Sequence, residues 1–189
     1  MISLRSESYN VVEMKRILIV CIAIAVAHVF VTSCSTIDCP AINTVRTYYK
    51  ICNSDGSEMT FKSALSVISK RSNGTDTLLF SNKDDTLLLN RGTEISDFSL
   101  PVSYSHPEDI LVFVYSNLAG DEIYATDTAW IKKDDIPHFE SVDCNVSFFH
   151  RLTGVRHTNN FIDSLVIKET SVTYDQTKVH FFLYPDTVR

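Results

Sequence analysis

The sequence predicts an all-β protein: an antiparallel β-sandwich with an immunoglobulin-like Greek key and extra strands toward the C-terminus. Short segments rich in β-branched and aromatic residues alternate between apolar and polar positions, and turn residues separate them at regular spacing. The composition of the 189 residues, with 44% hydrophobic and 21% charged, is typical of a folded chain and excludes a disordered one.

The first half of the expected domain contains the clearest strands. Every second residue of 45–51 is apolar or threonine, which predicts a strand with one buried face. Residues 98–104 alternate in the same way, and Pro101 places this strand at a sheet edge because it has no backbone donor. Residues 110–115 are continuously apolar and predict a central strand that is covered on both faces.

Two hairpins and one ambiguous segment complete this half. The first hairpin joins residues 75–80 to residues 86–90. The second returns from the central strand at Gly120 into residues 123–131. We expect residues 57–68 to be mainly strand, because β-branched side chains in their second half outweigh the alternative of a short capped helix.

The C-terminal part predicts four more strands, rich in β-branched and aromatic residues. They cover residues 146–149, 161–167, 171–174 and 178–184. A turn over residues 175–177 is expected between the last two. We expect residues 41–189 to form a single domain, with a sub-boundary at the charged segment 132–137.

The N-terminus has the pattern of a secretory signal peptide. Lys15 and Arg16 precede an apolar run over residues 17–31, which is short for a membrane-spanning helix. Residues 14–33 are therefore the expected signal. Residues 1–13 carry polar and charged side chains that contribute nothing to export, and we interpret them as an extension of the gene model.

The signal ends at a candidate lipid attachment site. Residues 31–34 have the sequence Val-Thr-Ser-Cys, which resembles the bacterial lipobox. The resemblance implies that Cys34 is acylated and begins the mature chain, with residues 34–40 as a lipidated tether. Several acyl chains, at about 0.8 kcal/mol per buried CH₂, make an effectively permanent anchor. Ser35 follows the cysteine in place of an acidic residue, which by resemblance to other lipoproteins implies the outer membrane and a periplasm-facing domain.

Three cysteines remain in the expected mature domain, Cys39, Cys52 and Cys144, in an oxidising compartment. Cys39 and Cys144 lie in polar, turn-like settings, whereas Cys52 ends an apolar strand. We therefore expect a Cys39–Cys144 disulfide, and the alternative is a local Cys39–Cys52 staple. The pattern has no paired spacing typical of a zinc site.

The sequence holds no motif that activates a nucleophile or cradles a phosphate. His150 and His157 flank an expected turn at residues 153–154 without metal-ligand spacing, and residues 53–56 fail the calcium-loop pattern. We therefore expect no catalytic residues, no cofactor and no metal. The formal net charge of −6 also argues against nucleic acid as a partner, since phosphate binding needs a basic face.

One tripeptide pattern is repeated. Asp, then Ser or Thr, then an apolar residue occurs five times, where composition predicts about one. It resembles the acceptor motif of a periplasmic O-glycosylation system found in one phylum of Gram-negative bacteria. The resemblance implies glycans on some of these hydroxyls; the alternative is that Asp-Thr simply begins strands. The hydroxyls belong to Thr77, Thr86, Thr128, Ser164 and Thr187.

From Cys34 onward, the layout resembles a family of small bacterial outer-membrane lipoproteins of unknown function. The resemblance is carried by Cys34 with residues 38–40, and by residues 87–90, 100–104, 126–128 and 139–144. The family implies no activity, so no catalytic role is carried over.

These observations lead to one expected function and one alternative. We expect a non-enzymatic protein-interaction module, held on the membrane by its lipid, whose partner is an envelope protein such as an outer-membrane barrel. The alternative is a glycan-binding β-sandwich module with an aromatic stacking platform. The candidate platform residues are Tyr48, Tyr49, Tyr104, Trp130 and Tyr174.

Overall fold

The computed structural model describes residues 13–22, 24, 39, 45–70, 86–144 and 146–186. The chain divides into two units, Met1–Asp38 and Cys39–Arg189. Residues 13–22 of the first unit are helical, and no helix within the described residues has the length and apolarity needed to span a membrane. The expected strand at residues 75–80 lies outside the described residues, as do Cys34, Thr77 and Thr187.

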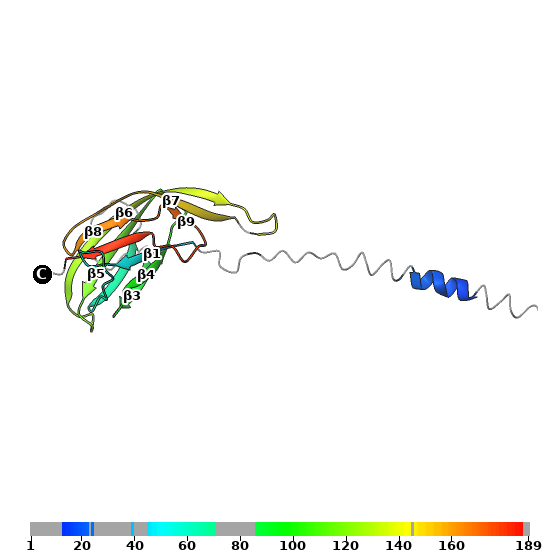
Figure 1. Cartoon of the computed structure of the whole chain (residues 1–189), viewed down its shortest axis with the longest axis horizontal. Coiled ribbons are helices and arrows are strands. Elements are labelled where there is room, and N and C mark those ends of the chain that lie inside the picture. The colour runs from blue at the N-terminus through cyan, green and yellow to red at the C-terminus, as the bar shows by residue number, and fades with distance from the viewer. Residues whose placement is uncertain are drawn as a thin grey trace, which may run out of the picture. The chain divides into compact units, whose positions relative to one another are not determined.

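The second unit is built from two β-sheets packed as a sandwich, as predicted (Figure 1). Its strands are β1 (Arg46–Ile51), β2 (Ala64–Lys70), β3 (Thr86–Gly92), β4 (Asp97–Pro101), β5 (Glu108–Ser116), β6 (Ile123–His138), β7 (Ser147–His157), β8 (Ile162–Ile167), β9 (Ser171–Val172) and β10 (Phe181–Pro185). One sheet has the order β4-β1-β10-β8, and the other has the order β3-β2-β5-β6-β7-β9. Strands β1 and β10 pair in parallel, and the other paired strands are antiparallel. The finer prediction of an immunoglobulin-like Greek key is not confirmed.

The core lies between the sheets and is rich in aromatic rings. Tyr49 of β1 stacks between Phe98 of β4, at 4.7 Å between ring centroids, and Phe181 of β10, at 4.8 Å. Its edge meets Phe113 of β5, on the facing sheet, at 6.4 Å. The predicted alternation of residues 45–51 is confirmed, because every second side chain of this segment is buried.

Two further strand predictions are confirmed. Strand β4, which contains Pro101, lies at the edge of its sheet. Strand β5 lies between β2 and β6 and is covered on both faces. Alternate side chains of β5 enter the main core. Val112 and Val114, which point to the other face, form a second buried cluster with Ile68 of β2.

Strands β6 and β7 are longer than the sequence predicts. Strand β6 is one strand of 16 residues and runs through residues 132–137, where a sub-boundary was expected. Strand β7 runs for 11 residues through Thr153 and Gly154, where a turn was expected. Both strands continue because each pairs with the other along most of its length. Together they project beyond the neighbouring strands as a hairpin, which we call the arm (Figure 1).

The C-terminal strands extend both sheets instead of forming a separate unit. Strands β7 and β9 join the six-stranded sheet, whereas β8 and β10 join the four-stranded one. The turn expected at residues 175–177 is present, with Asp175 Oδ1 accepting the Thr177 backbone N–H at 3.0 Å. It connects strands of different sheets. His180, which directly precedes β10, is fully buried, and its Nδ1 accepts the Tyr48 backbone N–H at 3.0 Å.

Candidate functional site

A cluster of charged side chains lies where the arm leaves the sandwich. On the inward face of β6 and β7, Ile131 and Leu152 belong to the core. The next inward positions along the same face are Lys133, Asp135 and His150, with Asp135 paired opposite His150. Charged side chains take these inward positions because the apolar core does not extend this far along the two strands. The loop at residues 102–107 contacts the strands here instead.

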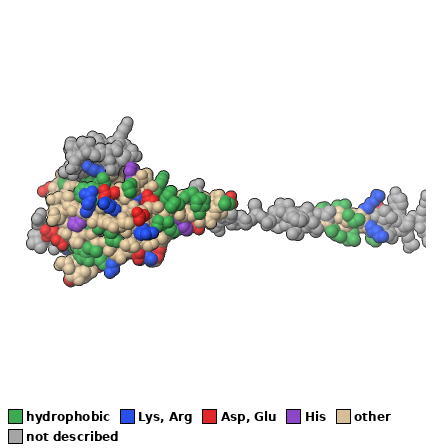
Figure 2. Space-filling model, turned by 90° about the horizontal axis from the view of Figure 1, so that it is seen from above, with side chains coloured by type: hydrophobic (Ala, Val, Ile, Leu, Met, Phe, Trp, Pro, Cys, Tyr) green, Lys and Arg blue, Asp and Glu red, His purple; other side chains and the backbone are tan. Residues whose placement is uncertain are grey.

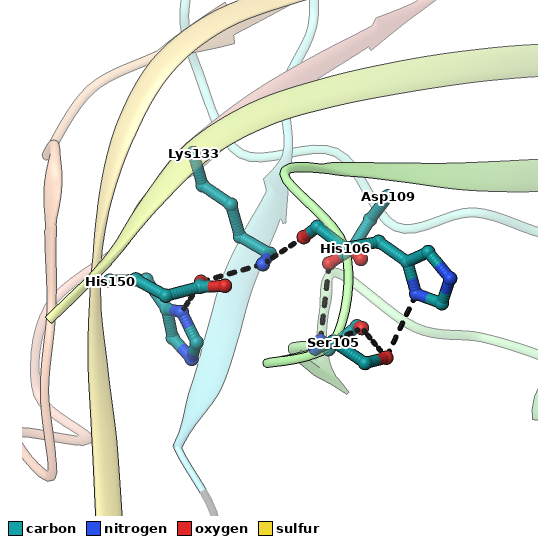
Figure 3. Close-up of polar contacts among 7 residues, drawn as sticks. Ser105, His106, Asp109, Lys133 and His150 are labelled. Carbon is teal, nitrogen blue, oxygen red and sulfur yellow. Dashed lines mark hydrogen bonds and ion pairs between the residues drawn. The ribbon is translucent and has the colours of Figure 1, made fainter. Parts of the chain in front are cut away.

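Lys133 fastens this loop to the arm. Its side chain is 0% exposed, and Nζ donates hydrogen bonds to the His106 carbonyl oxygen and to Asp135 Oδ1, both at 2.7 Å (Figure 3). The Lys133 backbone N–H also donates to the Pro107 carbonyl oxygen at 3.0 Å. A buried ammonium is tolerated only with such partners, so the loop and the strand depend on each other.

Burial sets the protonation of the groups around Lys133. Burial lowers the pKa of His150, and the hydrogen bond to Asp135 opposes this effect only in part. The imidazole is therefore neutral at pH 7. His150 Nδ1 lies 2.6 Å from Asp135 Oδ1, so the neutral ring donates its N–H to the carboxylate. Burial also raises the pKa of Asp109 to about 6, against the opposing charge of Lys133. Asp109 Oδ2 accepts the Ser103 backbone N–H at 3.3 Å.

A hydroxyl and an imidazole meet on the exposed side of the same loop. Ser105 Oγ lies 2.8 Å from His106 Nδ1 and 3.1 Å from Ser103 Oγ (Figure 3). Nucleophile activation also needs a group that orients the base, and in the described part of the chain no carboxylate contacts His106 Nε2. Nor do the described residues include three His, Cys, Asp or Glu side chains grouped for a metal ion. The contacts of the cluster hold the loop at residues 102–107 against β6.

Asp127 is a fully buried carboxylate. In the sequence it appeared only as part of the repeated tripeptide pattern, and that pattern did not predict a structural role for it. Its Oδ1 accepts hydrogen bonds from Thr158 Oγ1 and the Asn160 backbone N–H, each at 2.7 Å. Its Oδ2 accepts the backbone N–H groups of Phe161, at 2.7 Å, and Ile162, at 2.8 Å. Four donors make the buried charge tolerable, and they fix the connection from β7 to β8.

The end of the arm is cross-linked to the start of the second unit. Cys39 and Cys144 form a disulfide with a Cα–Cα distance of 5.6 Å, which confirms the predicted pairing. Cys144 lies in the loop between β6 and β7, at the tip of the arm. Cys52 is a buried free thiol, so the alternative Cys39–Cys52 staple is excluded.

Apolar side chains are exposed around this disulfide. Val142 is 92% exposed and Phe139 65% exposed, and hydrophobic side chains gather along the arm in Figure 2. On the inward face of the arm, Tyr104 stacks on Phe148 with ring centroids 5.4 Å apart. We call the exposed apolar set the tip surface; it consists of Tyr104, Ile136, Phe139, Val142 and Val146.

A second exposed apolar set lies at the opposite end of β6. We call it the turn surface; it consists of Leu118, Ile123 and Tyr124, each at least half exposed. The turn beneath it is held firmly, because Asn117 Oδ1 accepts the Gly120 backbone N–H at 2.7 Å and Arg91 Nη2 donates to the Leu118 carbonyl oxygen. Gly120 has a φ of 80°, which this tight turn requires and glycine tolerates.

A family model matches residues 64–185, from the start of β2 to the end of β10, and its description is a family of unknown function, DUF6452. The chain belongs to the DUF6452 family. No curated protein and no solved structure matches the chain. The expected resemblance to a family of unknown function is confirmed, while the lipoprotein and outer-membrane features stay predictions. The DUF6452 region includes the arm, the charged cluster and Cys144; β1 and Cys39 precede it.

The candidate glycosylation sites of this DUF6452 chain differ in accessibility. Thr86, at the start of the edge strand β3, is exposed. Ser164 in β8 is half-buried, and so is Thr128, which follows the fully buried Asp127. Thr77 and Thr187 are not among the described residues. Glycosylation stays a prediction, and Thr86 is the described acceptor that an enzyme would reach most easily.

The candidate residues of the aromatic platform, on which the glycan-binding alternative depends, lie in different surroundings in the DUF6452 domain. Tyr49 is in the core, and Tyr104, in the loop at residues 102–107, is exposed and stacks on Phe148 of the arm. Trp130 is covered by the Arg156 guanidinium, whose Cζ lies 4.0 Å from the ring centroid. Tyr48 lies beside His180, and Tyr174 meets Phe149 edge-on.

Proposed function

We propose that this DUF6452 protein is a lipid-anchored, periplasm-facing module of the cell envelope that binds another protein without turning over a substrate. The turn surface carries the partner part of the proposal. Leu118, Ile123 and Tyr124 are exposed apolar side chains around one turn. Contiguous exposed apolar patches often mark interaction sites, which supports the proposal.

The backbone of the turn surface should lose little conformational entropy when a partner binds. Its backbone is already fixed by Asn117 and Arg91, so a partner does not have to order it. Tyrosine is one of the residue types that contribute most to protein interfaces, and Tyr124 is exposed here. Asp121 and Glu122 beside it supply a polar rim.

The position of the turn surface also fits an anchored module. It lies at the start of β6, whose 16 residues span about 50 Å at roughly 3.3 Å per residue. The far end of β6 leads to Cys144, which is bonded to Cys39, and Cys39 follows the proposed lipid site by five positions. Anchoring at one end of a long strand leaves the other end free to meet a partner.

The charged cluster supports a role other than catalysis. Lys133 Nζ is closed from solvent and donates to two acceptors, so it is poorly placed to attack a substrate. Asp135 and His150 are likewise engaged with each other.

Co-purification from cross-linked envelopes tests this function. The full chain with Leu118→Ser and Tyr124→Ser is compared with the wild type and with Val166→Ser, a matched exposed apolar change on β8. We expect the turn variant to lose at least 90% of the main cross-linked protein partner, and Val166→Ser to keep it, with unchanged thermal melts for both. Equal recovery from all three proteins would contradict the proposal.

A further inference from the structure

We propose that the tip surface rests on a zwitterionic phospholipid surface, held there by the lipid on Cys34 acting through the Cys39–Cys144 disulfide. The inference rests on the proposed lipid anchoring. It adds which part of the folded domain touches the membrane, and therefore how the domain is oriented.

The reach of the chain brings the tip to the membrane. Cys34 precedes Cys39 by five positions, and five residues of fully extended chain span at most about 18 Å. Lipid on Cys34 holds that residue at the headgroups, so Cys39 stays within this distance of them. Because Cys39 is covalently bonded to Cys144, the tip of the arm stays there too.

The side chains beside Cys144 suit such a surface. Phe139, Val142 and Val146 are exposed within the same short loop. Among the described residues, none of the three belongs to the buried core or to the apolar side chains packed against it. Interfacial binding grows with the apolar area that leaves water, and a lipid anchor supplies the second attachment that a weak apolar contact needs.

The negative charge of the loop at residues 139–146 favours zwitterionic over anionic lipid headgroups. Residues 139–146 contain Glu140 and Asp143 but neither Lys nor Arg. Anionic headgroups would repel this loop, whereas zwitterionic headgroups would not. His138, whose Nε2 lies 2.8 Å from Glu140 Oε1, does not reverse the sign, because the two carboxylates of the loop outnumber this one imidazole.

The arm is stiff enough to pass this contact on to the whole domain. On one face His138 stacks on Phe149, at 4.0 Å between ring centroids, and Tyr174 meets Phe149 edge-on at 5.0 Å. Tyr174 also donates a hydrogen bond to Ser147 Oγ at 2.5 Å. A tip that rests on lipid would therefore fix the direction of β6 and point the turn surface away from the membrane.

Fluorescence quenching by brominated lipid tests the inference on the full lipidated chain in phosphatidylcholine vesicles. Trp130→Phe removes the natural tryptophan, and a reporter is then introduced as Val142→Trp at the tip or as Leu118→Trp at the turn surface. We expect brominated phosphatidylcholine to reduce the fluorescence at position 142 at least twofold and to leave position 118 unchanged. Adding 30% phosphatidylglycerol should weaken quenching at position 142.

The outcomes separate the inference from the anchoring on which it rests. If palmitate labels Cys34 and the protein floats with vesicles, but position 142 is quenched no more than position 118, the inference is overturned and the anchor stands. If neither labelling nor flotation occurs, both fall. Cys39→Ser provides a second test, because it separates the lipid from the arm without removing the lipid. Undiminished quenching at position 142 in that variant would refute the role of the disulfide.

Discussion

Asp127 holds four donors of the connection between β7 and β8 while it is closed from solvent. Asp127→Asn should lower the free energy of unfolding by about 2–4 kcal/mol, because an amide NH₂ replaces an acceptor that faces N–H donors. Urea unfolding at pH 7 measures the loss. Asp163→Asn, an exposed change on the neighbouring strand β8, should alter stability by less than about 0.5 kcal/mol. Similar losses in both variants would show that Asp127 is not the anchor.

For Asp109 we predict the opposite effect: the change to asparagine should stabilise the fold. Its pKa in the folded protein is about 6, above the ordinary value of 3.8, so the folded state holds a proton that the unfolded state releases between these values. Stability from this group is therefore present below about pH 4 and is lost as the pH rises through about 6. Asp109→Asn imitates the protonated form and should raise stability at pH 7 by about 1–3 kcal/mol.

The measurement for Asp109 is a pair of denaturation curves at two pH values. The gain from Asp109→Asn should be large at pH 7 and close to zero at pH 4, where the wild type is itself protonated. A gain that is the same at both pH values would mean that ionisation of Asp109 is not its source.

At the scale of elements, the disulfide joins the arm to the residue where the second unit begins. Cys39→Ser and Cys144→Ser should destabilise the fold by similar amounts, up to about 4–5 kcal/mol for a loop of this length. The double variant should match either single one, because all three lack the same cross-link. Thermal melts under non-reducing conditions check this, and additive losses would contradict it. Cys52→Ser, a change at a buried thiol, should destabilise less.

Strands whose pattern is local were predictable, and strands that depend on distant partners were not. Residues 45–51, the central strand β5 and the edge strand with Pro101 follow from alternation, continuous apolarity and a missing donor. Residues 132–135 looked like a break because four charged residues in a row are typical of a loop. They remain in β6 because β7 pairs alongside them and the loop at residues 102–107 satisfies Lys133.

The charged cluster could have been found from one signal in the sequence. Inward positions of a strand alternate, so the series Ala129, Ile131, Lys133 and Asp135 places a cation and an anion on the face that begins in the core. Charge at inward positions indicates a buried pair, but its partners could not be predicted. His106 and His150 come from segments that only the folded chain brings together.

At the scale of the whole molecule, the proposed lipid on Cys34 would decide where the protein is found. Cys34→Ala should leave the protein unlabelled by palmitate and shift it from the membrane fraction to a soluble or signal-retaining form. The physical reason is that the thiol is the only attachment point the lipobox resemblance provides. Metabolic labelling followed by fractionation checks both parts. Equal palmitate incorporation in the variant would refute the lipobox interpretation, and Cys21→Ala serves as the matched control.

The parallel pairing of β1 with β10 has a consequence for when the protein can fold. The centre of the four-stranded sheet joins β1 to β10, the first and last of the described strands, with Tyr49 opposite Phe181. This sheet cannot close until the ribosome has made residue 185, and contacts so distant along the chain form slowly. The four-stranded sheet therefore stays incomplete until the last strand has been made. Under the export that we propose for this chain, the sandwich would close only after β10 has crossed the membrane.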